Sequence, residues 1–130
     1  MALQDLIQSV EGIFNITSRN DGYATEKSRF TEGTLLELED EELTYKSTAR
    51  FTSEKKEICG TKLIIENERG KGEASFPMHI PFGKKLLIGQ KVRYSEKSWS
   101  SEMEGTSTEY SLEVLSGNLN GEKLEERVFV

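Results

Sequence analysis

The sequence is poor in the residue types that build covalent cross-links and metal sites. Its 130 residues include one cysteine, Cys59, one histidine, His79, and one tryptophan, Trp99. A single cysteine excludes an internal disulfide and favours a reducing compartment. No basic start followed by an apolar run marks a signal peptide, and no stretch reaches the roughly 20 apolar residues of a membrane-spanning helix. We therefore expect a soluble, cytoplasmic protein that does not enter a membrane.

The same scarcity leaves few ways to build a reactive centre. A structural zinc site needs about four cysteine, histidine or carboxylate ligands, which this chain cannot supply in the usual combination. The densest acidic run, Glu37 with residues 39–42, lacks the glycine of a calcium loop and is typical of a solvated hairpin tip. No Gly-x-Ser-x-Gly elbow and no phosphate-binding loop occurs. We predict no metal, no cofactor and no catalytic residue; paired carboxylates in a cavity are the enzyme class that stays open.

The charges also exclude two classes of partner. The net charge is −6, from 17 basic and 23 acidic residues, and the two signs are mostly interleaved. Nucleic-acid binding needs a basic stripe that displaces counterions from phosphates. Nucleic acids and anionic membrane surfaces are therefore not expected as partners.

Alternation of apolar and polar residues is abundant. Ala74, Phe76, Met78 and Ile80 occupy every second position, and similar rows recur along the chain. A period of two sends one set of side chains to a core and the other set to water. Turn-forming clusters separate the rows about every ten residues, which favours antiparallel neighbours. The predicted strands are 12–18, 23–30, 33–38, 43–52, 58–66, 73–80, 86–94, 106–115 and 123–130, with turns at 39–42, 68–72, 81–83 and 116–121.

Residues 2–10 carry the one helical pattern, because apolar residues recur there at spacings of three and four. Gly12 follows as a stop signal, and so short a helix needs to dock on the sheet. We expect a single all-β domain over residues 1–130. It is an antiparallel meander of about eight or nine strands, closed or nearly closed into a small calycin-like barrel that this N-terminal helix caps. A β-sandwich is the alternative.

The strands 58–66 and 73–80 are expected to form a hairpin that joins two apolar rows. The expected pairs are Ile65–Ala74, Leu63–Phe76 and Thr61–Met78. This register turns Cys59 inward and His79 outward, so a Cys–His dyad fails on geometry. Pro77 cannot donate to a ladder, which predicts that its strand is an edge strand or carries a bulge.

Two partial resemblances accompany these patterns. Residues 76–81, Phe-Pro-Met-His-Ile-Pro, resemble the Phe-Pro-x-x-x-Pro segment of arrestin-like β-sandwich proteins. The N-terminal helix, the glycine at the first strand and the short hairpins are similar to calycin-type barrels, which include lipocalin-like and fatty-acid-binding-like proteins. The Gly-x-Trp signature of lipocalins is absent, because Gly12 is followed by Ile13 and Phe14. Neither resemblance transfers a functional residue to this chain.

The expected barrel predicts a non-enzymatic protein that binds a small apolar or amphipathic molecule in the barrel or at its mouth. The candidate ligand-binding residues lie on the expected inward faces: Tyr45, Phe76, Met78, Tyr94 and Tyr110. The alternative is a protein-interaction module or homodimer that uses an exposed strand edge near Pro77 and the polar loop 95–101 around Trp99. Phe82, in the turn 81–83, is the second candidate interaction residue.

Overall fold

The computed structural model describes residues 5–20, 22–47, 49, 51 and 53–130. Within them the chain forms eight antiparallel strands and one short helix, which confirms the all-β class. The elements are β1 (Asp5–Glu11), β2 (Phe14–Asn20), β3 (Thr25–Lys46), β4 (Lys55–Asn67), β5 (Gly70–Phe76), α1 (Lys84–Leu87), β6 (Lys91–Ser101), β7 (Gly105–Val114) and β8 (Lys123–Phe129). The strand order is β1-β2-β3-β6-β7-β8, and β4 lies off this path between β3 and β5.

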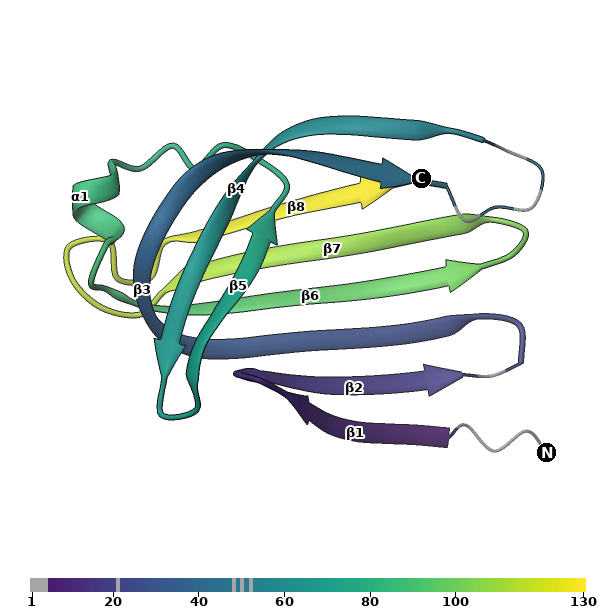
Figure 1. Cartoon of the computed structure of the whole chain (residues 1–130), viewed down its shortest axis with the longest axis horizontal. Coiled ribbons are helices and arrows are strands. Elements are labelled where there is room, and N and C mark those ends of the chain that lie inside the picture. Colours follow the sequence, from purple (N-terminus) through teal and green to yellow (C-terminus); the bar gives the residue numbers. More distant parts are fainter. Residues whose placement is uncertain (1–4, 21, 48, 50, 52) are drawn as a thin grey trace.

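The 22-residue strand β3 belongs to two arms of the sheet. Up to Thr34 it pairs with β6, and from Thr34 onward it pairs with β4. The register shifts between Leu35 and Glu37, which marks a bulge at the bend. Gly33 is required there because a Cβ would lie 2.4 Å from the carbonyl oxygen of Glu66. Figure 1 shows β3 curving so that its second half, β4 and β5 cross the long strands.

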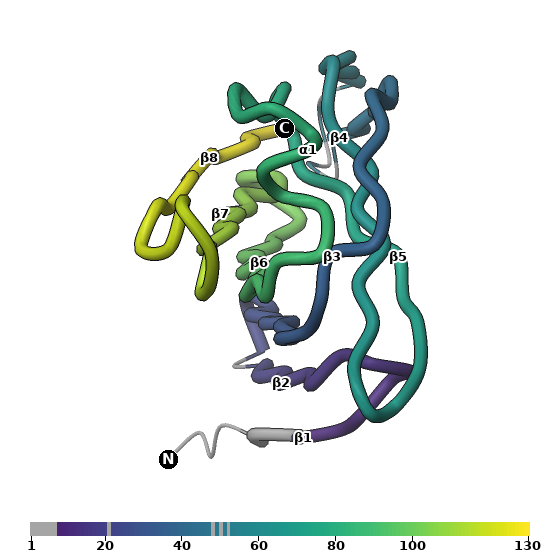
Figure 2. The backbone as a smooth tube through the Cα atoms, turned by 90° about the vertical axis from the view of Figure 1, so that its left-hand side faces the viewer, coloured from purple at the N-terminus to yellow at the C-terminus, as the bar shows by residue number. Residues whose placement is uncertain are grey.

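We name β1, β2, the first half of β3, β6, β7 and β8 the long arm, and the second half of β3, β4 and β5 the short arm. The core lies between them (Figure 2). The face of the long arm that is turned toward the short arm is its inner face. The fully buried large apolar side chains are Tyr94, Phe76, Ile13, Leu35, Leu63, Ile65, Leu87, Leu112, Val92 and Val114. Two buried hydroxyls are satisfied, because Thr31 donates to the carbonyl of Ile13 and Thr61 to that of Met78.

The sheet does not close into a barrel. In the described part of the chain β1, β5 and β8 each pair with a single neighbour, and from Glu37 onward β3 pairs only with β4, so the outer edges of these strands stay open. β5 ends at Phe76 because Pro77, which is buried, has no N–H to donate. The chain then leaves the sheet through residues 77–83. The expected closure is therefore wrong, whereas the edge position predicted from Pro77 is confirmed.

The helix expected over residues 2–10 is wrong from residue 5 onward, where the chain forms β1; residues 2–4 lie outside the described residues. β1 pairs with the whole of β2. Gly12, with a φ of 58°, and Ile13 form the two-residue turn between them, which is the Gly-x pattern of a tight hairpin. A short helix is marginal in water, whereas this hairpin extends a sheet that is already formed.

The turn expected at residues 39–42 is also wrong, because these residues lie inside β3. β3 and β4 continue as a two-stranded ribbon until Lys46 lies opposite Lys55. The ribbon is closed beyond that pair, where the N–H of Ser47 donates to the carbonyl of Glu54 over 2.8 Å. The three predicted strands between residues 23 and 52 therefore merge into one long strand and its turn.

The hairpin of β4 and β5 is confirmed, with a register two residues away from the expected one. Leu63 lies opposite Ala74, and Thr61 lies opposite Phe76. A shift of two residues keeps each of these side chains on its face, and all four are buried. The shift also shortens the connection to a two-residue turn.

Cys59 is exposed, so its expected inward position is wrong. On the N-terminal side of Thr61, the face of β4 that carries Ile58 and Gly60 is turned toward the core. Gly60 is buried there, and Ile58 packs against the core. A Cβ on Gly60 would lie 2.5 Å from the carbonyl oxygen of Phe76, so the two backbones cross closely at this point. The strong twist of a two-stranded ribbon moves Cys59 away from the core.

The chain between residues 84 and 101 also differs from expectation. α1 and a turn replace the first part of the strand expected at 86–94, and β6 begins at Lys91. β6 then continues to Ser101 through the segment expected to be a polar loop. After Tyr94, the side chains on both faces of β6 are partly buried or exposed. Polar residues are therefore tolerated on both faces at this end of the long arm. The strands predicted at 106–115 and 123–130 are confirmed as β7 and β8.

In the described part of the chain, no helix has the length and apolar character to cross a membrane. The same residues contain no group of three His, Cys, Asp or Glu side chains placed to hold a metal ion.

Candidate functional site

The inner face of the long arm changes from apolar to polar along its strands. Near the bend, Tyr94 and Leu112 lie opposite each other and are buried. Further along β6, Glu96 lies opposite Arg29 of β3 on one side and Tyr110 of β7 on the other. Charged and phenolic groups therefore meet the border of the apolar core. We name this group the mouth cluster: Arg29, Tyr45, Tyr94, Glu96 and Tyr110.

Arg29 is held from two sides. Its Nη1 lies 3.3 Å from Oε1 of Glu96, and its guanidinium carbon lies 3.8 Å from the centroid of the Phe14 ring. The side chains of Arg29 and Glu96 are 29% and 22% exposed, so water screens this ion pair less than a surface pair. An aromatic face also favours a cation. The guanidinium is therefore held in place by an ion pair on one side and an aromatic ring on the other.

Tyrosine hydroxyls join the two arms at the same place. The Tyr94 hydroxyl donates to Glu96 and lies 3.2 Å from the carbonyl oxygen of Ser75 on β5. The Tyr110 hydroxyl donates to the Tyr45 hydroxyl over 3.3 Å. The contact of Tyr94 with Ser75 and the bond of Tyr110 with Tyr45 therefore link β6 and β7 to the short arm.

Burial keeps these phenols protonated. It raises the pKa of Tyr94 and of Tyr110 far above the usual value, and the negative charge of Glu96 adds to both shifts. Burial also raises the pKa of Tyr45. A protonated phenol both donates and accepts hydrogen bonds. The mouth cluster therefore presents neutral hydroxyl groups beside an ion pair whose charges compensate each other.

Arg29 and Glu96 contribute to the lining of three open hollows, of which two lie beside the inner face and the third lies on the outer face of the long arm. The first inner hollow has a volume of about 390 Å³ and a mostly polar lining, in which Leu43 and Ala74 form an apolar wall. The second has a volume of about 400 Å³ and is polar, with Lys27 among its lining residues. Each lies within the range of small-molecule sites, roughly 300–1,000 Å³.

The predicted ligand-binding residues all contact the core, but they differ in access. Tyr45 and Tyr110 line the first hollow. Phe76 and Tyr94 are fully buried, and Met78 is partly buried against the core. A ligand at the mouth would thus touch Tyr45 and Tyr110 first, and ligand binding by all five residues stays a prediction.

The sequence analysis missed Arg29 and Glu96. Glu96 follows Tyr94 by two positions, and Arg29 precedes the buried Thr31 by two, so the period of two marks both as inward charges. The expectation of a loop at residues 95–101 removed Glu96 from its strand. The alternation of Val92 and Tyr94, extended by two positions, marks Glu96 as an inward side chain.

The two predicted interaction residues lie in different parts of the fold. Trp99 lies in β6 between its neighbours β3 and β7, is partly buried, and has Nζ of Lys97 5.2 Å from its ring centroid. Phe82 lies in the segment 77–83 and packs against the core. The expected surface near Pro77 and Trp99 is therefore not a continuous strand edge, and an interaction role for either aromatic residue stays a prediction.

His79 and Cys59 lie outside the mouth cluster. His79 is exposed as expected, and its Nδ1 lies 3.1 Å from Oδ1 of Asp40. Cys59 is exposed on β4. The sequence analysis rejected a dyad of these two residues, and the structure places both side chains on the surface of the molecule.

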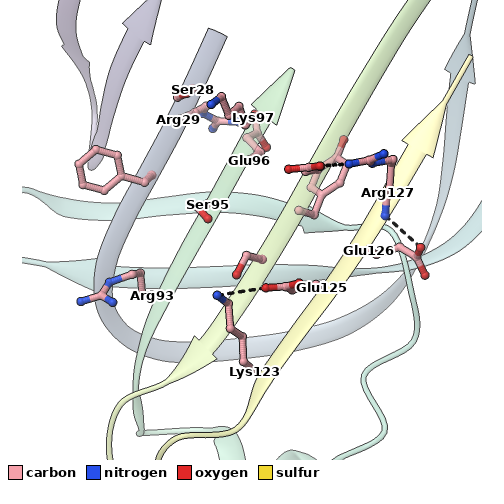
Figure 3. A pocket seen from close by; sticks show the side chains of 14 residues that line it. Ser28, Arg29, Arg93, Ser95, Glu96, Lys97, Lys123, Glu125, Glu126 and Arg127 are labelled. Atoms are coloured by element: carbon pink, nitrogen blue, oxygen red, sulfur yellow. Dashed lines mark hydrogen bonds and ion pairs between the residues drawn. The ribbon is translucent and has the colours of Figure 1, made fainter. Parts of the chain in front are cut away.

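A larger hollow of about 700 Å³ lies on the outer face of the long arm, across β3, β6, β7 and β8 (Figure 3). Its floor is made of small side chains, among them Ser95, and long charged side chains surround it. These charges are paired: Arg93 with Glu32 and Glu113, Lys97 with Glu26, Lys123 with Glu125, and Arg127 with Glu109. The pairing leaves this outer trough with little net charge, and exposed ion pairs of this kind contribute little energy. The mouth cluster is the stronger candidate site.

No family model, curated protein or solved structure significantly matches this chain. The function is therefore argued from the geometry of the mouth cluster.

Proposed function

We propose that this chain is a non-enzymatic binding protein that takes a small amphipathic molecule at the mouth between its two arms. One observation carries the proposal. The paired hydroxyls of Tyr45 and Tyr110 and the ion pair of Arg29 and Glu96 converge at the border of the apolar core, beside an open hollow. Convergent polar groups next to an apolar wall, with shifted pKa values, are typical of a ligand site.

The apolar part of the ligand would lie against the short arm. Leu43 and Ala74 contribute apolar surface to the first hollow, and the ring of Tyr110 contributes an aromatic surface. Behind this wall the core is filled, with Phe76 packed edge-on against Tyr110 at a centroid distance of 6.4 Å. The ligand would therefore rest at the mouth and not deep between the arms.

The polar part of the ligand would accept hydrogen bonds. A guanidinium carries five N–H donors and no acceptor, so Arg29 has more donors than one carboxylate oxygen can use. The phenols of Tyr45 and Tyr110 add hydroxyl groups that burial keeps protonated. A carbonyl, carboxylate or hydroxyl group on the ligand would suit this donor-rich border.

The proposal is tested by amide chemical-shift perturbation with dodecanoate, dodecanol and a retinoid. We expect saturable shifts at Leu43, Tyr45, Ala74 and Tyr110, with dissociation constants in the micromolar to millimolar range. The carboxylate and the alcohol distinguish recognition of a charge from recognition of a hydroxyl. If no member of the set shifts these residues at millimolar concentration, the proposed function is wrong.

A pair of matched variants separates the mouth from general surface binding. Tyr45→Phe removes one hydroxyl from the mouth and should weaken binding about threefold to tenfold, since one hydrogen bond contributes about 0.5–1.5 kcal/mol. Tyr23→Phe makes the same chemical change at a residue that is 92% exposed and should leave binding unchanged. Equal weakening by both variants would contradict the proposed location.

A further inference from the structure

Among the residues that the structure describes, no strand pairs with the outer edge of β8, and the direction of the hydrogen-bonding groups on that edge is known. Val130 and Thr106 exchange two backbone hydrogen bonds, so even-numbered residues at the end of the chain bond to β7. The register of β8 and β7 continues this alternation. The N–H and C=O groups of Lys123, Glu125, Arg127 and Phe129 therefore point away from β7, and all four of these residues are exposed.

One of these edge groups is occupied by a neighbouring side chain. The N–H of Arg127 donates to Oε1 of Glu126 over 3.0 Å. Glu126 is itself exposed and lies opposite Tyr110 of β7. A carboxylate in this position covers a donor that another strand would need, which is one way that proteins protect sheet edges.

A second copy of β8 fits this edge in one antiparallel register. When Glu126 lies at the two-fold axis, Glu125 lies opposite Arg127 of the second copy, and the pair occurs twice. In this register Leu124 lies opposite Val128, and Lys123 lies opposite Phe129. With Glu125 at the axis, two glutamates face each other and Lys123 faces Arg127; with Arg127 at the axis, two arginines face each other. A register centred on Leu124 also pairs opposite charges, but it overlaps only residues 123–125 of β8. Overlap length and charge complementarity together therefore select the register centred on Glu126.

We propose that β8 is a pairing edge for a second copy of this chain, in the register centred on Glu126, and that the Glu126 carboxylate holds this edge closed. Glu126 opposes pairing in two ways. It covers the N–H of Arg127, and in the dimer it would face the Glu126 carboxylate of the second copy, which is a like-charge contact. Removal of this one side chain frees the donor and removes the repulsion. The two long arms would then join into one continuous antiparallel sheet.

Sedimentation equilibrium between about 1 and 500 μM tests the proposal. Wild-type protein is expected to be monomeric or weakly associated, and Glu126→Thr is expected to dimerise at least tenfold more tightly. The control is Glu122→Thr, which removes the same charge from an exposed residue that precedes β8, and it should match the wild type.

Charge variants in the Glu126→Thr background test the register. Adding Glu125→Arg places two arginines opposite each other and should weaken the dimer at least tenfold. Adding Arg127→Glu to that variant restores opposite charges and should recover the dimer. A Glu126→Thr protein that stays monomeric, or whose dimer is insensitive to Glu125→Arg, would overturn the proposed edge. A wild-type dimer as tight as that of Glu126→Thr would overturn the closing role of Glu126.

Discussion

The hydroxyl of Tyr110 on β7 donates a hydrogen bond to the hydroxyl of Tyr45 on β3, over 3.3 Å and across 65 residues of sequence. This contact joins the long arm to the short arm at the mouth. Because the sheet is open, such side-chain contacts and the core, and not a closed ladder of strands, hold the two arms together.

Tyr110→Phe should lower the free energy of unfolding by about 1 kcal/mol, since it removes one hydrogen bond without changing the packing of the ring. Tyr45→Phe should be at least as costly, because it leaves the more buried hydroxyl of Tyr110 without its acceptor. Urea denaturation measures both changes. Unchanged midpoints in both variants would show that this bond contributes nothing to stability.

Gly33→Ala should destabilise the protein by about 1–3 kcal/mol or prevent folding, because the added Cβ would meet the backbone of Glu66 at the bend of β3. Gly83→Ala is the matched control. Gly83 has a φ of −62°, and a Cβ at this position would have no heavy atom within 4 Å, so alanine there should be neutral or slightly stabilising. Thermal unfolding compares the two, and equal effects would contradict the close approach at the bend.

Leu63→Ala should cost about 2–5 kcal/mol, because Leu63 is fully buried between the arms and its truncation leaves a cavity. Phe51→Ala should change stability by less than about 0.5 kcal/mol, because Phe51 is 82% exposed. Chemical denaturation of both variants tests whether the core lies where the two arms meet. A larger loss for Phe51→Ala would place the core elsewhere.

Glu96→Gln should destabilise the protein by about 1–3 kcal/mol, because it leaves the Arg29 charge and the Tyr94 hydroxyl without a carboxylate in a half-buried site. Glu109→Gln breaks the ion pair with Arg127 on the exposed outer face, and its effect should stay below about 1 kcal/mol. In the wild-type protein, a higher salt concentration should reduce the stability contributed by the Arg127–Glu109 ion pair more than that contributed by the Arg29–Glu96 ion pair. Equal losses in the two variants would contradict the special environment of Glu96.

The tyrosines of the mouth cluster predict a loss of stability at high pH. Their pKa values are raised in the folded protein, so above about pH 10 the unfolded chain releases phenolic protons that the folded protein retains. The titration of these phenols therefore leaves the free energy of unfolding unchanged below about pH 10. Above that pH the free energy of unfolding falls by about 1.4 kcal/mol per pH unit for each such tyrosine. Tyr110→Phe should reduce the slope of unfolding free energy against pH between 10 and 12. An identical slope in the variant would refute the raised pKa of Tyr110.

The alternation in the sequence was sufficient to predict an all-β fold and most of its buried faces. Thr61, Leu63, Ala74 and Phe76 are buried as predicted, even though their register is shifted by two residues. Side-chain direction depends on the parity of the register and not on its absolute value, which explains this result. Edge placement of β5 also followed from the sequence, because Pro77 has no N–H whatever its surroundings.

Three predictions of secondary structure are wrong because the local sequence pattern is compatible with two structures. Apolar residues at 3, 6, 7 and 10 satisfy a helical spacing, yet Gly12 and Ile13 close a tight hairpin and the segment becomes β1. The acidic run at 39–42 is compatible with a turn or with an exposed ribbon, and pairing with β4 favoured the ribbon. Residues 95–101 are polar on both faces, so their strand could not be recognised from burial alone.

The sequence by itself determined most of the side chains that avoid water, because the period of two is a property of each strand alone. The bend of β3 decided the rest. It lays the short arm across the long arm, leaves the sheet open, and brings Tyr45 to Tyr110 and Arg29 to the border of the core. Such contacts depend on the angle between two packed layers, to which residues far apart in the chain contribute together, and no local pattern contains that angle.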